Sequence, residues 1–159
     1  MRTMLTSTVA SPGLSLVTSA PLRTRPPRLA RAMKTNKILV VEDDVDTLLG
    51  LRVLLRAHYY PSVVAQNAAD AVTQTREHHP ELILLDLGLP GTDGFALLKF
   101  LGRGYLSRVP VIVLSGRDRL ENKERALRAG AVHYLQKPWD DDDLLETIDR
   151  YMTRLPYAA

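Results

Sequence analysis

The chain has 159 residues, of which 45% are hydrophobic and 25% charged, and this length and balance suit one globular domain with a modest core. It contains no cysteine, which excludes a disulfide framework and a thiolate metal site, and no apolar run approaches the ~20 residues that span a bilayer. The net charge of +3 is unevenly spread. Seven of the 21 basic residues and none of the 18 acidic residues precede Glu42, so the remainder is mildly acidic and gives no electrostatic case for nucleic acid.

The first 33 residues are rich in Ser, Thr, Pro and Arg and show no sustained hydrophobic periodicity. We interpret residues 1–33 as a disordered or untranslated extension, with Met33 as an alternative start, and residues 34–159 as the folded domain. A secretory signal would need a stronger apolar core than residues 14–17 supply. A second interpretation stays open, in which arginines of this segment form a basic arm for an acidic partner: Arg23, Arg25, Arg28 and Arg31.

Apolar strand patterns and amphipathic helix patterns alternate through the rest of the chain. The expected strands cover residues 37–41, 62–65, 81–86, 110–114 and 131–135. The expected helices follow these strands in turn: one through Leu48, Leu51 and Leu55 that ends before Pro61, then 68–78, 93–105, 119–129 and about 141–155. Five repeats of strand and helix predict an α/β fold, in which a parallel sheet lies between two layers of helices.

Polar residues stand where the apolar strands end. They are Asp43 and Asp44 after the first strand, Asp86 at the end of the third, Ser115 after the fourth and Lys137 after the fifth. Right-handed crossovers place all of these ends on one edge of the sheet. Carboxylates brought together repel each other and need a cation, and oxygen ligands alone suit Mg²⁺. A lysine and a hydroxyl beside them suit a phosphoryl group, so Asp86 is the predicted nucleophile that forms an acyl phosphate.

Taken together, Glu42-Asp43-Asp44, the run LDLGLPGTDG around Asp86, VIVLSG at Ser115 and Lys137-Pro138 closely resemble the receiver domain of response regulators, over residues 37–155. The resemblance implies a flavodoxin-like (βα)5 fold with strand order 2-1-3-4-5. It implies that Asp86 is the phosphoacceptor, that Lys137 and Ser115 contact the phosphoryl group, and that Ser115 and Tyr134 form a conformational switch. The implied Mg²⁺ ligands are Asp43, Asp44, Asp86 and the backbone carbonyl of Gly88. A cis Lys137-Pro138 bond is also expected, because a tight turn must aim the lysine over the sheet edge.

The expected function is that of a single-domain response regulator in the cytoplasm. By the resemblance, it takes a phosphoryl group from a sensor histidine kinase or a histidine phosphotransfer protein and is no enzyme toward a separate substrate. It then signals to an unknown downstream protein or passes the phosphoryl group on.

Two surfaces are expected to contact other proteins. Helical phase places Leu49, Gly50 and Val53 opposite the buried leucines, so these residues, with Pro138, form the predicted docking surface for the phosphoryl donor. The fourth helix, the last strand and the final helix form the expected readout face and a candidate homodimer interface. No membrane contact is expected.

Two other functions stay open. An aspartyl-phosphate phosphatase of another α/β fold would have a second catalytic Asp two residues after the nucleophile, where this chain has Gly88. A DNA-associated regulator would depend on the basic N-terminal arm alone, because the chain leaves no room for a helix-turn-helix. Nucleic acid is therefore not expected as a partner.

Overall fold

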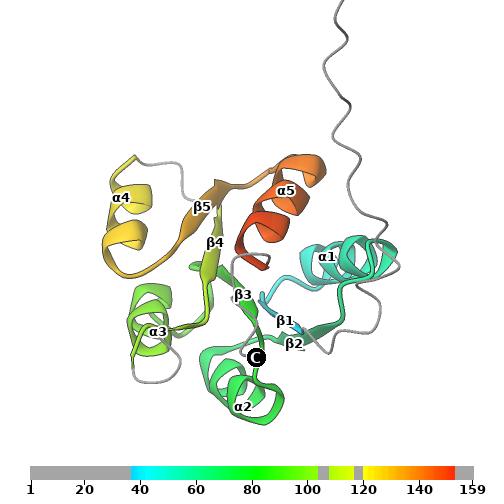
Figure 1. The fold of residues 1–159 in the computed structure, drawn as a ribbon. Coiled ribbons are helices and arrows are strands. Elements are labelled where there is room, and N and C mark those ends of the chain that lie inside the picture. Colours follow the sequence, from blue (N-terminus) through cyan, green and yellow to red (C-terminus); the bar gives the residue numbers. More distant parts are fainter. Residues whose placement is uncertain (1–36, 104–107, 117–119, 153–159) are drawn as a thin grey trace, which may run out of the picture.

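The computed structural model describes residues 37–103, 108–116 and 120–152, which form a three-layer α/β sandwich (Figure 1). Five parallel strands lie in the order β2-β1-β3-β4-β5. The strands are β1 (Ile38–Val41), β2 (Ser62–Ala65), β3 (Leu82–Asp86), β4 (Val111–Ser115) and β5 (His133–Gln136). The helices are α1 (Val45–Ala57), α2 (Ala68–His78), α3 (Gly94–Leu101), α4 (Leu120–Arg128) and α5 (Asp141–Met152). The predicted flavodoxin-like fold is confirmed, and the expected extension, residues 1–33, lies outside the described residues.

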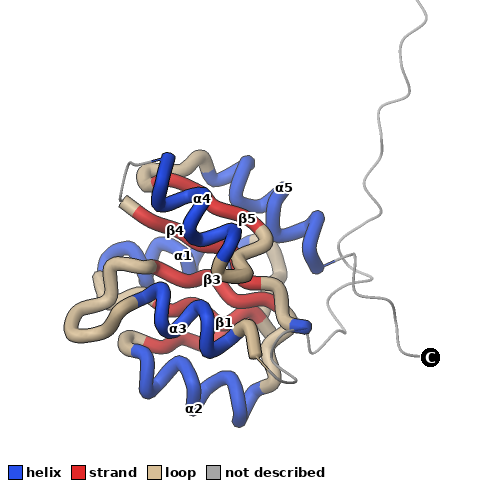
Figure 2. Tube along the Cα trace, turned by 90° about the vertical axis from the view of Figure 1, so that its left-hand side faces the viewer, coloured by secondary structure: helices blue, strands red, loops and turns tan. Residues whose placement is uncertain are grey.

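The sheet is covered on both faces, which explains why its central strands are unbroken apolar runs. Helices α2, α3 and α4 lie over one face, and α1 and α5 lie over the other (Figure 2). Along β3, Ile83 and Leu85 point toward the first layer and Leu82 and Leu84 toward the second, and all four are fully buried. Each such side chain contributes about 1.5–3 kcal/mol through burial. The core therefore holds β3 firmly in place and fixes the position of Asp86 at its end.

Polar side chains fix where the helices begin. At the start of α2, Asn67 Oδ1 accepts a hydrogen bond from the N–H of Asp70 at 2.8 Å. At the start of α3, Asp93 Oδ1 accepts from the N–H of Phe95 at 3.0 Å. Asp140 caps α5 by accepting from two N–H groups of the first turn at 2.9 and 3.2 Å. These caps satisfy N–H groups that lack partners within the helix, and they lie in the loops at the carboxyl edge of the sheet.

Two elements have the bounds that the sequence predicts, β2 and α2, whereas α3 is shorter than predicted. It ends at Leu101 instead of residue 105, and Gly102 forms its C-cap, because glycine costs a helix about 1 kcal/mol relative to alanine. Residues 105, 119 and 155, where three helix ends were predicted, lie outside the described residues. In the part of the chain that the structure describes, no helix has the length and apolar character needed to cross a membrane.

Candidate functional site

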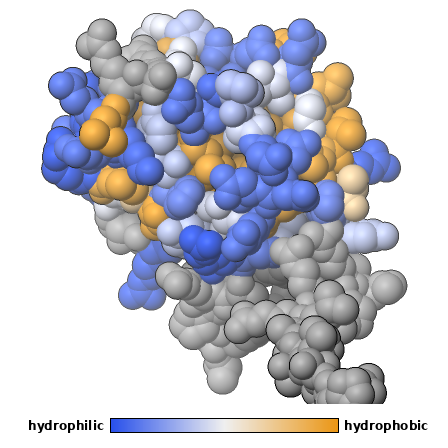
Figure 3. Space-filling view, turned by 90° about the horizontal axis from the view of Figure 1, so that it is seen from above, coloured by the Kyte–Doolittle hydropathy of each residue, from blue (hydrophilic) through white to orange (hydrophobic). Residues whose placement is uncertain are grey.

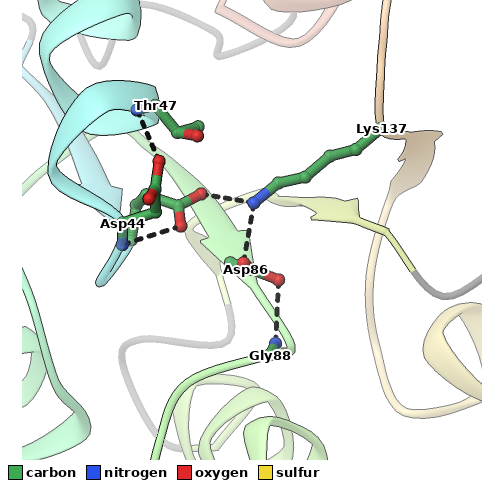
Figure 4. Close-up of polar contacts among 6 residues, drawn as sticks. Asp44, Thr47, Asp86, Gly88 and Lys137 are labelled. Atoms are coloured by element: carbon green, nitrogen blue, oxygen red, sulfur yellow. Dashed lines mark hydrogen bonds and ion pairs between the residues drawn. The ribbon is translucent and has the colours of Figure 1, made fainter.

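Asp86 lies at the carboxyl end of the central strand and is nearly buried, with 7% of its surface exposed. Both carboxylate oxygens are engaged. Oδ1 accepts a hydrogen bond from the N–H of Gly88 at 2.8 Å, and Oδ2 lies 2.7 Å from the Lys137 ammonium (Figure 4). The loop and the lysine therefore hold the carboxylate in one orientation at the sheet edge.

Lys137 follows β5 and reaches across the sheet edge to two carboxylates. Its Nζ lies 2.6 Å from Glu42 Oε2 as well as 2.7 Å from Asp86 Oδ2. Its backbone N–H donates to the carbonyl of Ser115 at 2.9 Å, which ties the start of the loop to β4. Burial alone would lower the pKa of Lys137, but the hydrogen bonds to Asp86 and Glu42 outweigh burial and raise the pKa above its usual value. The lysine therefore stays charged at neutral pH.

Glu42 is the most deeply buried carboxylate of the site, with 1% of its surface exposed. Its backbone N–H continues the ladder beyond β1 by donating to the carbonyl of Ala65 at 3.0 Å, so its side chain is held at the sheet edge. Burial raises the pKa of Glu42; the hydrogen bond from Lys137 opposes this rise, and the nearby charge of Asp86 adds to it. Glu42 and Asp86 thus share one lysine as their countercharge.

The carboxylates that the structure brings together are Glu42, Asp43 and Asp86, whose oxygens lie within 4.8 Å of one another. This differs from the predicted set, in which Asp43 and Asp86 were joined by Asp44. The Asp44 side chain instead caps α1 by accepting from the N–H of Thr47 at 2.8 Å, and its pKa is lowered by its hydrogen bonds with Thr47 (Figure 4). Within the described residues, Glu42 therefore lies where Asp44 was expected, beside Asp43 and Asp86.

A sequence signal could have distinguished these residues. Asp44 stands four positions before Leu48, the first buried residue of the helical pattern, and Asp is a preferred N-cap residue. An aspartate that caps a helix directs its oxygen at the helix, which leaves Glu42 and Asp43 to face the sheet edge. The run Glu42-Asp43-Asp44 therefore contains one capping residue and two site residues.

The other predicted site residues lie on β4, on β5 and in the loop after β5. Ser115 ends β4 and is fully buried, one position beyond Leu114, which pairs with Asp86. Tyr134 is buried in the core on the face that α2, α3 and α4 cover. The Lys137-Pro138 peptide bond is cis, as predicted.

Comparisons with known proteins identify the family. The response regulator receiver domain matches residues 38–149. The transcriptional regulatory protein KdpE of Mycobacterium tuberculosis is 38% identical over 122 residues, which are 77% of this chain and 53% of KdpE, so the chain spans about half the length of that relative. Protein PilH of Pseudomonas aeruginosa is 33% identical over 114 residues, which are 71% of this chain and 94% of PilH. The crystal structure of a CheY-like receiver domain protein from Methanospirillum hungatei has a TM-score of 0.69 and 30% identity, covering 74% of this chain and 94% of that one. This chain belongs to the response regulator receiver domain family.

Proposed function

We propose that this receiver domain accepts a phosphoryl group on Asp86 from the phosphohistidine of a sensor kinase or of a histidine phosphotransfer protein. The observation that carries the proposal is the geometry of Asp86 itself. It is a carboxylate at the end of a rigid strand, with a lysine at 2.7 Å and a backbone N–H at 2.8 Å to orient it. A carboxylate held in this way loses little entropy on reaching the geometry for attack.

In the proposed step, an Asp86 oxygen attacks the phosphorus of phosphohistidine. A P–O bond forms, the P–N bond breaks, and the imidazole nitrogen leaves with the bonding electron pair and takes up a proton. Lys137 is placed to balance the added negative charge, because it already contacts Oδ2. Ser115 is placed at the end of the neighbouring strand to donate a hydrogen bond to a phosphoryl oxygen. The product is an acyl phosphate on Asp86, and hydrolysis or onward transfer would end the signal.

The residues fit a Mg²⁺ ion. Glu42, Asp43 and Asp86 offer only oxygen ligands, which are the ligands that Mg²⁺ prefers, and the carbonyl of Gly88 follows closely in the same loop. We propose that these residues hold the ion, with Glu42 in place of Asp44. When bound, Mg²⁺ would neutralise part of the charge on the phosphoryl oxygens.

The outer face of α1 is the proposed docking surface for the phosphoryl donor. Val45, Leu49 and Val53 recur at every fourth position and are 62%, 57% and 62% exposed, whereas Leu48, Leu51 and Leu55 are buried, as the helical phase predicts. Figure 3 shows hydrophobic residues gathered on the side of the molecule where α1 lies. An exposed apolar row beside the acidic site suits the apolar face of a donor helix.

A shallow cavity of about 250 Å³ extends this surface toward the loop that carries Lys137. Its lining comes from α1, from the loop after β5 and from the first residue of α5: Thr47, Gly50, Leu51, Leu54, Trp139 and Asp141. Gly50 leaves space at the helix surface, because a Cβ there would meet no atom within 4 Å. Pro138 is exposed next to the cavity. We propose that the donor contacts Gly50 and Pro138 while its histidine reaches Asp86.

The proposed readout face consists of α4, β5 and α5. Tyr134 is buried between the sheet and the α4 layer, and we propose that phosphorylation favours this buried position over an exposed one through Ser115. Leu120 and Leu127 are exposed on α4, which suits contact with a downstream protein or with a second copy of the chain. Beryllofluoride and Mg²⁺ should shift amide NMR signals on this face, and the Ser115→Ala variant should lose these shifts. Shifts confined to the site loops would remove the proposed readout.

Labelling with acetyl phosphate tests the phosphoacceptor directly. Wild-type protein with Mg²⁺ should gain one phosphoryl group by mass spectrometry, and Asp86→Asn should gain none. Asp46→Asn, an exposed aspartate in the first turn of α1, is the matched control and should label normally. If Asp86→Asn is labelled as strongly as wild type, Asp86 is not the phosphoacceptor.

Donor docking has its own test. Leu49→Glu with Val53→Glu should slow phosphotransfer from the donor protein but leave labelling by acetyl phosphate unchanged. Leu127→Glu, on the exposed side of α4, is the control. Unchanged transfer to a folded double variant would refute the docking surface.

We also propose that this response regulator, which would receive its phosphoryl group from a kinase, works in the cytoplasm.

A further inference from the structure

The edge of the sheet opposite Asp86 carries features that phosphotransfer does not use. This edge, here called the amino edge, is where the strands begin and where α1 and α2 end. The start of β1 lies between these helix ends, because Ile38 N–H donates to Pro61 O at 2.9 Å and Glu81 N–H donates to Lys37 O at 3.0 Å. Parallel strands are spaced by about 4.8 Å, so the starts of β2 and β3 are about 10 Å apart along the sheet, while the ends of α1 and α2 lie on its opposite faces.

Two ring side chains at the amino edge stand on left-handed backbone. Tyr59 follows α1 with a φ of 60°, and the next N–H, of Tyr60, bonds Leu55 O at 2.9 Å, which closes the helix. His79 follows α2 with a φ of 46°. Glycine usually occupies such positions, since other residues are strained there. Both rings are exposed, Tyr59 by 62%, so neither ring gains core packing in exchange for the strain. Stability therefore does not explain why rings occupy these two positions.

Each ring follows a helix whose last turn carries an arginine. Arg56 and Arg76 are exposed in the last turns of α1 and α2, and Lys37 Nζ lies 3.3 Å from His78 Nδ1 between them. Within the described residues, neither arginine takes part in a salt bridge. The helix dipole favours cations at these ends, but it does not call for exposed rings beside them.

The charges of the molecule are thus separated along the strands. The carboxyl edge holds the acidic site, whereas Lys37, Arg56 and Arg76 lie at the amino edge, where the carboxylates of Glu77, Glu81 and Asp149 also lie. The mildly negative net charge of the part after Lys37 conceals this separation. The segment before Lys37 contains six further basic residues and no acidic one, and it joins the fold at the amino edge. With this basic segment, the amino edge would attract a polyanion, and the acidic carboxyl edge would repel one.

A shallow, open depression of about 240 Å³ lies against the exposed tyrosine and is lined by Arg56, Tyr59, Tyr60 and Pro61. A depression of this size has room for a single planar base and not for a folded peptide. A guanidinium and a tyrosine ring on its walls are the groups on which nucleic acid bases stack.

We propose that the amino edge binds single-stranded nucleic acid. Tyr59 stacks on a base that enters the depression beside Arg56, and Arg76 and Lys37 contact phosphates of the same strand. Single strands fit better than duplexes because the depression needs an unstacked base. Anionic membranes and acidic peptides would match the charge but would not use a depression for one planar ring.

The test is fluorescence anisotropy with the full chain and a labelled oligothymidylate. Tyr59→Gly should weaken binding by about tenfold, the loss expected for one stacked base. Because glycine suits a φ of 60°, this variant should melt no lower than wild type, so poor folding cannot explain the loss. Arg56→Gln and Arg76→Gln should each weaken binding and reduce its salt dependence by about one counterion. Lys123→Gln, which makes the same charge change on α4, should bind as wild type does.

Several outcomes would overturn the proposal. One is the absence of binding, and another is equal affinity of wild type, Tyr59→Gly and the arginine variants, which would assign binding to the basic segment alone. Duplex DNA or vesicles containing phosphatidylserine that bind as tightly as the single strand would show attraction by charge only. Labelling of Asp86 by acetyl phosphate should be the same in all these variants, so this test and that of the phosphoacceptor can fail independently.

Discussion

Replacing Lys137 by methionine should destabilise the protein by about 3 kcal/mol at neutral pH in the absence of divalent cations. Methionine keeps most of the length of the side chain but removes the charge that Glu42 and Asp86 share. At an effective dielectric constant of about 20, each contact of about 2.7 Å corresponds to roughly 6 kcal/mol of gross attraction. The cost of burying the charges offsets much of this, and removing one partner of a buried pair costs about 3–5 kcal/mol. Because Lys137 is partly exposed, we expect the loss of stability to lie at the lower end of this range.

The loss of stability in Lys137→Met should become smaller as the pH falls. Burial already raises the folded-state pKa of Glu42, and loss of Lys137 removes a contribution that lowers it. A carboxyl group with a raised folded-state pKa binds a proton more readily in the folded state than in the unfolded state. Stability therefore increases as pH falls through that pKa. The difference in stability between wild type and Lys137→Met should therefore shrink as the pH falls and Glu42 becomes protonated.

Urea unfolding with EDTA at a series of pH values measures this difference. Lys123→Met, an exposed lysine replaced in the same way, should change stability by less than about 0.5 kcal/mol. Adding Glu42→Gln to Lys137→Met should recover part of the loss, because one of the two uncompensated charges is then removed. A loss that is equally large at every pH would refute the reasoning, because packing and not charge would then explain it.

Three further predictions follow from particular contacts. Gly94→Ala should destabilise the protein by at least about 2 kcal/mol in urea unfolding, because its Cβ would lie 2.6 Å from the Cα and carbonyl oxygen of Leu87. Gly50→Ala, whose Cβ would have no atom within 4 Å, should be neutral or stabilising. Asp43→Ala should lose Mg²⁺ affinity in calorimetry, whereas Asp44→Ala should keep this affinity and melt at a lower temperature, because α1 loses its cap. Equal loss of affinity in both variants would contradict the assignment of Asp43 as a ligand and Asp44 as a cap. Burial and the charge of Arg150 lower the pKa of His133, so the folded state takes up this proton less readily than the unfolded state, and stability should fall as pH falls through the ordinary histidine range. His133→Gln should reduce the slope of the unfolding free energy against pH in this range, and an unchanged slope would exclude His133 as its source.

The sequence predicts the fold well because the fold depends on patterns that are local and strong. The apolar runs of β1, β3 and β4 have no exposed face, and Pro61 and Pro80 stand between helices and the strands that follow. The end of α3 was harder to place, since Gly102 and Gly104 are the only residues between Leu101 and residue 105 that disfavour a helix.

The site was predicted less completely, for a geometric reason. Residue type alone cannot tell which two of three consecutive acids face the sheet edge, because this depends on where β1 stops and α1 begins. The hydrogen bond from Glu42 N–H to Ala65 O extends the strand by one residue, and Asp44 then serves as the cap. The left-handed conformation of Tyr59 has no sequence signature either, because glycine is the residue expected there.

The position of β3 has a consequence for how the protein moves. Strands pair with it on both sides, and helices cover both of its faces, so its amides should be among the last to exchange with solvent. Asp86 therefore sits at the end of the stiffest part of the molecule. Under the proposed function, a phosphoryl group added to Asp86 would not be accommodated by a shift of the strand. The displacement would pass into the surrounding loops, so that a change of one side chain would become motion at the periphery, where other proteins could detect it.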